Sequence, residues 1–89
     1  MQLVLRHANV SRKGGPWSEH DYDVFDGDRE VGRIYGVGGR SDGEWFWGLS
    51  FRLTGEKRYG RALSLDEAKA AFKAEYEAWR AAVSPLRSN

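Results

Sequence analysis

The sequence contains no cysteine, only two prolines and one methionine. Without cysteine the chain can form no disulfide bond and offers neither a thiolate nucleophile nor a Cys-rich zinc site. A membrane-spanning helix needs about 20 consecutive apolar residues, and no stretch of the sequence approaches that length. The N-terminal residues also lack the basic and apolar regions of a secretory signal, so we expect a cytoplasmic protein that does not associate with membranes.

Aromatic residues are plentiful by contrast, with four Trp, four Tyr and four Phe in 89 residues. A chain of this length forms one domain and buries only about 60–65% of its surface on folding, so we expect the aromatic side chains to supply most of its core. The formal net charge is +1 and the isoelectric point is about 8.1. A dedicated DNA-binding domain usually has a value above about 9, so the overall charge does not by itself indicate nucleic-acid binding.

A helix is predicted over residues 64–84. It begins at a capping box, in which the Ser64 hydroxyl accepts a hydrogen bond from the Glu67 N–H while the Glu67 carboxylate accepts one from the Ser64 N–H. Pro85 ends it, and residues 85–89 are expected to form a flexible tail. Apolar side chains at spacings of three and four form one stripe along it: Leu65, Ala68, Phe72, Tyr76, Trp79 and Val83. A helix with one apolar stripe of this kind is expected to pack on a sheet.

The predicted sheet occupies residues 21–63. Residues 44–53 alternate, which predicts one long strand with a core face formed by Trp45, Trp47, Leu49, Phe51 and Leu53. The Asp26-Gly27 pair predicts a tight turn between a strand through Tyr22, Val24 and Phe25 and a second strand at 29–35. A short strand is expected at 58–63, and Leu3 and Leu5 predict an edge strand within a loosely attached N-terminal segment, residues 1–20.

These elements predict an α+β fold, an antiparallel β-meander of four or five strands with one C-terminal amphipathic helix packed on one face. One helix covers one face of a sheet, so the opposite face must be solvated, covered by residues 1–20 or used for binding. Phe46 must point away from Trp45 and Trp47, onto that helix-free face. The candidate binding residues are Arg33, Tyr35, Arg40, Phe46, Arg52, Lys57 and Arg58.

Three patterns suggest chemistry, and each has a simpler structural interpretation. Residues 39–43 match the G-x-S-x-G nucleophile motif, but a strand follows them and the chain is too short for an α/β-hydrolase, so we interpret them as a hairpin loop. The acidic residues between 21 and 30 lack calcium-loop spacing and are expected to be solvated in a hairpin. His7 and His20, the only histidines, have no spacing that suggests a site. We therefore predict no catalytic residue, no metal site, no cofactor and no small-molecule substrate.

The segments Asp23-Val24-Phe25-Asp26-Gly27, Val31-Gly32-Arg33-Ile34-Tyr35, Trp45-Phe46-Trp47-Gly48-Leu49 and Ser64 to Phe72 resemble a family of small uncharacterised alphaproteobacterial proteins. That resemblance covers most of the chain from Tyr22 onward and implies an architecture but no mechanism. In layout alone, three strands followed by a helix are also similar to AP2 and integrase N-terminal DNA-binding domains, which lay a sheet face in the major groove. The early arginine pattern of AP2 domains is absent, and shape alone does not determine function.

The sequence therefore predicts a small non-enzymatic interaction module. Its helix-free sheet face, or a strand edge, is expected to dock a protein partner or a second copy of the chain. The alternative is a nucleic-acid-binding module that uses the same face. A face ringed by the candidate arginines would favour nucleic acid, and a mixed or apolar face would favour a protein partner.

Overall fold

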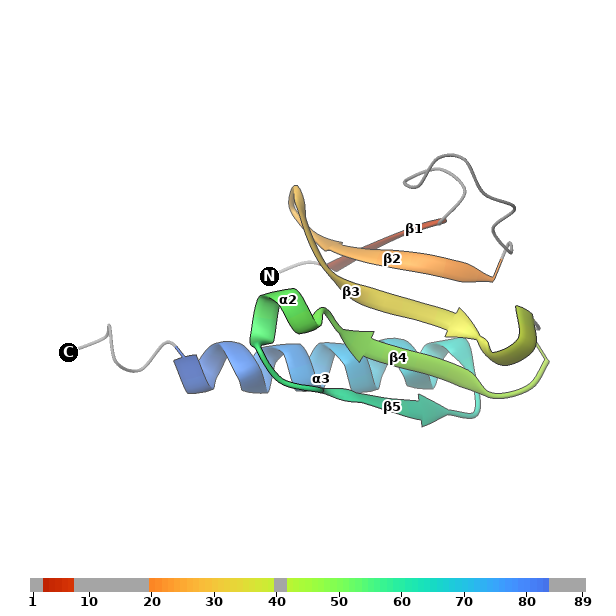
Figure 1. Cartoon of the computed structure of the whole chain (residues 1–89). Helices are drawn as coiled ribbons and strands as arrows, with labels where there is room; N and C mark the ends of the chain where they lie inside the picture. The colour runs from red at the N-terminus through yellow and green to blue at the C-terminus, as the bar shows by residue number, and fades with distance from the viewer. Residues whose placement is uncertain (1–2, 8–19, 40–41, 84–89) are drawn as a thin grey trace.

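The computed structural model describes residues 3–7, 20–39 and 42–83. It is an α+β fold in which five antiparallel strands form one sheet, in chain order, and a long helix lies on one face of that sheet (Figure 1). The predicted fold class is therefore confirmed. The predicted tail at 85–89 and most of the N-terminal segment lie outside the described residues. No helix in the described part of the chain is long and apolar enough to cross a membrane.

The strands are β1 (Leu3–His7), β2 (Asp21–Asp26), β3 (Arg29–Gly36), β4 (Trp45–Leu49) and β5 (Tyr59–Ala62). A short 3-10 helix, η1 (Val37–Gly39), follows β3, a one-turn helix, α2 (Phe51–Thr54), follows β4, and the long helix is α3 (Leu65–Val83). All five residues of β1 pair with β2, which confirms the predicted edge strand. The turn between β2 and β3 uses Gly27 at a φ of 67°, a conformation that favours glycine, as the Asp26-Gly27 signal predicts.

The prediction of one strand over residues 44–53 is wrong beyond Leu49. The Ser50 N–H donates to the Val31 carbonyl at 2.8 Å, and the chain then turns into α2. Within that turn the Leu53 and Thr54 N–H groups donate to the Ser50 carbonyl, and Gly55 ends it at a φ of 75°. Phe51 is consequently 61% exposed rather than part of the core. The bond to Val31 and the bonds within the turn together outweigh the apolar alternation, which by itself favours a strand.

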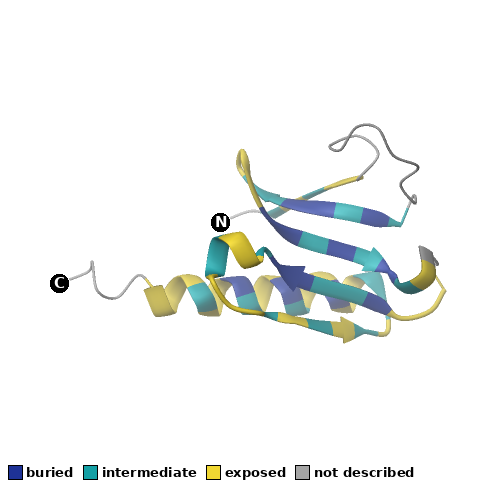
Figure 2. Ribbon diagram, in the orientation of Figure 1, coloured by how far each residue is buried: buried dark blue, intermediate teal, exposed yellow. Residues whose placement is uncertain are grey.

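The core lies between the sheet and α3 (Figure 2). From the helix it takes Ala68, Phe72 and Tyr76, each at most 2% exposed, which confirms the central part of the predicted stripe. From the sheet it takes Val24, Val31, Ile34, Trp45 and Leu49. α3 packs on β4, β5 and β3, so the sheet extends past the helix on the side of β2 and β1 (Figure 1).

Of the two hydrogen bonds that the predicted capping box places at the start of the helix, one is formed. The Glu67 N–H donates to the Ser64 hydroxyl at 3.1 Å, as predicted. The Glu67 carboxylate, however, accepts a bond from the N–H of Leu63 at 3.0 Å rather than from that of Ser64. The reciprocal contact is therefore made one residue earlier, and it joins the end of β5 to the first turn of α3.

Candidate functional site

Three aromatic rings from adjacent strands stack on the helix-free face of the sheet. Tyr35 on β3, Phe46 on β4 and Tyr59 on β5 form this aromatic row. Ring centroids are 5.0 Å apart for Tyr35 and Phe46, and 5.6 Å apart for Phe46 and Tyr59, with interplanar angles of 26° and 28°. The prediction that Phe46 points away from the core is consistent with this arrangement. Tyr59, on the outermost strand, is 58% exposed, so the row ends in solvent.

Arg33 lies beside Tyr35, at the end of the aromatic row that is farther from the β5 edge. Its guanidinium lies 4.5 Å from the Tyr35 ring centroid, within cation–π range. The same guanidinium donates two hydrogen bonds to the Asp21 carboxylate, at 2.9 and 2.6 Å. This two-pronged pair fixes the arginine against the ring and neutralises its charge. Arg33 therefore supports the row but does not offer an unpaired cation to a ligand.

The expectation that the acidic residues of 21–30 are solvated is wrong for two of them. Asp21 and Asp23 are 5% and 2% exposed. They lie on β2, between β1 and β3, and their partners on β3 are Tyr35 and Arg33. Asp26 also has partners, since it accepts a hydrogen bond from the Tyr76 hydroxyl at 2.7 Å and lies 3.6 Å from the Arg80 guanidinium. This contact ties the β2–β3 hairpin to the middle of α3.

Of the seven candidate residues, the structure brings together Arg33, Tyr35 and Phe46. Arg52 lies on α2, beyond the end of β4, so its predicted place on the helix-free face is wrong. Arg58 forms ion pairs with Glu56 and with Glu75 of α3, and hydrogen bonds to these two carboxylates raise its pKa. Lys57 is exposed in the segment between α2 and β5. Arg40 lies outside the described residues. A ring of free arginines around the face is therefore not formed by the described residues.

Sequence reasoning missed two residues that belong to this face, Tyr59 and Arg61. Arg61 is the cross-strand partner of Phe46 and forms an exposed ion pair with Glu44 at 3.2 Å. The signal was available, because residues 58–63 were expected to form a strand. Alternation along that strand puts Tyr59 and Arg61 on the same face, and pairing with β4 then decides which face it is.

The outer side of β5 is an edge to which no described strand pairs. On its inner side, the Leu49 N–H donates to the Arg58 carbonyl at 2.8 Å, so these two residues form a hydrogen-bonded pair. Hydrogen-bonded and non-bonded pairs alternate along an antiparallel ladder. Gly60 therefore directs its backbone groups to β4, and Tyr59 and Arg61 direct theirs outward. The free edge of β5 thus presents the backbone N–H and C=O groups of Tyr59, which ends the aromatic row, and of Arg61, which lies on the same face.

The two histidines take part in aromatic packing. The His7 ring lies 4.7 Å from that of Tyr22, and the His20 ring contacts Trp45 edge-on at 6.1 Å. Among the described residues, no three His, Cys, Asp or Glu side chains come together as metal ligands would. Ser41 of the G-x-S-x-G match lies outside the described residues.

No family model, curated protein or solved structure matches the chain.

Proposed function

We propose that the chain is a non-enzymatic interaction module that binds another protein by adding a strand to the free edge of β5. The proposed partner strand is β5 of a second copy. The observation that carries the proposal is the aromatic row, which runs across three strands and ends at Tyr59 on that edge. An added strand would place further side chains beside Tyr59, because side chains on adjacent strands of one face lie side by side.

The β5 edge is complementary to itself. If two copies pair antiparallel about a two-fold axis through Gly60, Tyr59 of each chain lies opposite Arg61 of the other. Both residues direct their backbone groups outward, so this register forms four backbone hydrogen bonds. It also sets each arginine beside a tyrosine ring, a favourable cation–π pair, and keeps the two arginines apart. An isologous contact of this kind is the commonest way in which identical chains assemble.

The charges around the edge favour a protein partner over nucleic acid. Arg33, Arg58 and Arg61 are each paired with a carboxylate, those of Asp21, Glu75 and Glu44 in turn. A face of this mixed composition does not create the positive field that attracts a phosphate backbone. It is suited to a neutral, self-complementary contact.

The first experiment measures association against concentration by analytical ultracentrifugation. Four residues of edge strand make a small interface, so we expect a weak dimer, with a dissociation constant on the order of micromolar to millimolar. The variant Tyr59→Lys sets a lysine opposite Arg61 of the other copy and should abolish the dimer. Its fold should be unaffected, because the ring is more than half exposed. Val4→Lys is the matched control, since Val4 is an exposed residue on the opposite edge strand, β1.

A mixing experiment tests the register itself. In Arg61→Asp the aspartate should weaken the homodimer, because it replaces the cation that contacts Tyr59. When this variant is mixed with Tyr59→Lys, the new lysine of one chain lies opposite the new aspartate of the other, while the remaining arginine and tyrosine still meet. The mixture should therefore associate more tightly than either variant alone. A monomeric wild-type chain, or disruption by Val4→Lys instead of Tyr59→Lys, would contradict the proposal.

Nucleic-acid binding is the second candidate, and the aromatic row itself favours it. Exposed rings on adjacent strands are the platform on which single-stranded nucleic acids stack their bases. The test is fluorescence anisotropy with a labelled single-stranded oligonucleotide at two salt concentrations. Binding that weakens steeply with salt, and is lost in Phe46→Ala and in Arg61→Ala, would support this candidate over strand addition.

A further inference from the structure

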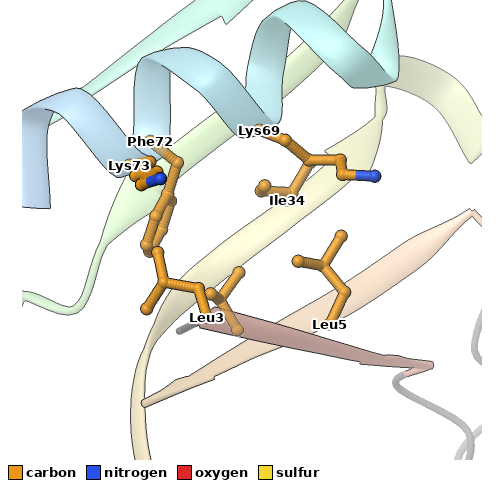
Figure 3. Close-up of a pocket in the computed structure, with 7 residues that line it drawn as sticks. Leu3, Leu5, Ile34, Lys69, Phe72 and Lys73 are labelled. Carbon is orange, nitrogen blue, oxygen red and sulfur yellow. The ribbon is translucent and has the colours of Figure 1, made fainter. Parts of the chain in front are cut away.

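The helix side of the sheet carries a cavity between α3 and β1. Leu3 and Leu5 point from β1 toward the helix, Phe72 points down from α3, and Ile34 lies between them (Figure 3). The cavity has a volume of about 250 Å³ and is also lined by Val24. It arises because α3 packs chiefly on β4, β5 and β3 and does not lie fully over β1 and β2. These five lining residues are all apolar.

Two lysines of α3 line the same cavity. Lys69 and Lys73 are four residues apart, so they lie one helical turn from each other on the same side of the helix. Lys69 lies 3.9 Å from Asp66, whose side chain is 95% exposed, and such an exposed pair contributes little. Lys73 has no ion-pair partner among the described residues. Two like charges at this spacing repel each other, and an anion between them removes that repulsion.

We infer that this cavity binds a small amphiphile with one carboxylate and a short unbranched alkyl chain. The chain fills the space between Leu3, Leu5 and Phe72, and the carboxylate meets Lys69 and Lys73 at the opening. Size limits the ligand, because cavities that hold drug-sized molecules measure roughly 300–1,000 Å³ and this one is smaller. Charge determines the head group, since the polar side chains at the cavity are both ammonium groups. The site is on the opposite face of the sheet from the aromatic row, so it does not depend on the proposed dimer.

The binding test is a titration of the full chain, labelled with ¹⁵N, with hexanoate, heptanoate and octanoate, followed by NMR. Amide shifts should concentrate in residues 3–7 and 69–73. Each methylene that enters the apolar cavity contributes about 0.8 kcal/mol, which corresponds to about a fourfold decrease in the dissociation constant per carbon. Octan-1-ol has the same chain without the charge and should bind several-fold more weakly than octanoate. Shifts scattered over the whole sheet, or no dependence on chain length, would overturn the inference.

Matched charge variants test the role of the lysines. Lys73→Gln should weaken octanoate binding several-fold and leave octan-1-ol binding unchanged. Lys57→Gln removes the same charge from an exposed position between α2 and β5, away from the cavity, and should leave both unchanged. Equal effects of the two variants on octanoate would show that net charge, and not this site, attracts the ligand. Circular dichroism confirms that both variants retain the fold.

A lipid membrane could supply the same anionic head and alkyl tail, so sedimentation with vesicles separates the two sources. The protein should not sediment with vesicles of phosphatidylcholine and phosphatidylglycerol, because the cavity has room for only one short alkyl chain. Sedimentation with these vesicles in the absence of octanoate binding would contradict the inference.

Discussion

Gly32 is the position at which the contact between the sheet and α3 can be tested with one added methyl group. A Cβ built on Gly32 would lie 2.5 and 2.6 Å from two ring carbons of Phe72 and would collide with the carbonyl oxygen of Gly48. The ring of Phe72 is 1% exposed, so it lies inside the core. The Gly48 carbonyl belongs to β4 and cannot move without breaking the ladder. The variant Gly32→Ala therefore forces either the helix or a central strand to shift.

The cost follows from these two collisions. Overpacking a core by one or two carbons typically costs about 1–3 kcal/mol. One of the two colliding groups is a backbone carbonyl, which cannot move aside as a side chain can. We therefore expect Gly32→Ala to lower the free energy of unfolding by an amount at the upper end of this range, about 3 kcal/mol or more. A domain of 89 residues has a total stability of roughly 4–13 kcal/mol, at 0.05–0.15 kcal/mol per residue. The variant should therefore be marginally folded, with a melting temperature lowered by about 12–24 °C.

Urea denaturation followed by tryptophan fluorescence measures this loss. Gly43→Ala is the control, because a Cβ there meets no atom within 4 Å and its φ is not positive. That variant should be as stable as the parent, or more stable by a few tenths of a kcal/mol. If Gly32→Ala and Gly43→Ala unfold at the same urea concentration, α3 does not approach β3 and β4 this closely and the packing described above is wrong.

Three further substitutions test α3. Phe72→Ala should lower the free energy of unfolding by about 3–5 kcal/mol, because the ring is fully buried, and a parent-like melting curve would place the apolar stripe in solvent. Ser64→Ala should cost about 1 kcal/mol in thermal melts without changing the circular dichroism spectrum, since the Glu67 N–H loses its acceptor; no loss would mean that the helix begins elsewhere. Tyr76→Phe removes the hydrogen bond to Asp26 and should cost about 1.5–3 kcal/mol at neutral pH. Burial, and then the hydrogen bond to Asp26, raises the pKa of Tyr76, so the neutral phenol stabilises the fold and this contribution is lost as the pH rises past about 10. Chemical denaturation between pH 7 and 11 should therefore show a smaller alkaline loss of stability in Tyr76→Phe than in the parent, and parallel pH profiles would refute this assignment.

The sequence determined those features that rest on local periodicity and local hydrogen bonds. The helix stripe through Ala68, Phe72 and Tyr76 could be read because side chains three and four residues apart share a helix face. The Asp26-Gly27 turn could be read because glycine accepts a positive φ at low cost. In the same way, alternation about Trp45 and Trp47 is enough to turn Phe46 away from the core.

Features that depend on contacts between distant segments were not available from the sequence. Residues 44–53 alternate perfectly, yet Ser50 finds the Val31 carbonyl 19 residues away and the chain turns into α2, which removes Arg52 from the sheet. Arg58 forms an ion pair with Glu75 because α3 packs against β5. In each case the sequence indicates which residue types are present, and the packing of another element decides where their side chains go.

The candidate sites also combine features that the sequence predicts with features that only the tertiary structure decides. Alternation was enough to turn Phe46 away from the core and to name Tyr35 as a candidate for the same face. The register between β3 and β4 was needed to place Tyr35 beside Phe46, and the register between β4 and β5 to extend the aromatic row to Tyr59. The cavity beside Lys69 and Lys73 could not be foreseen, because it exists only where α3 fails to cover β1 and β2. Periodicity specifies the face of an element on which a residue lies, and only the tertiary structure decides what that face meets.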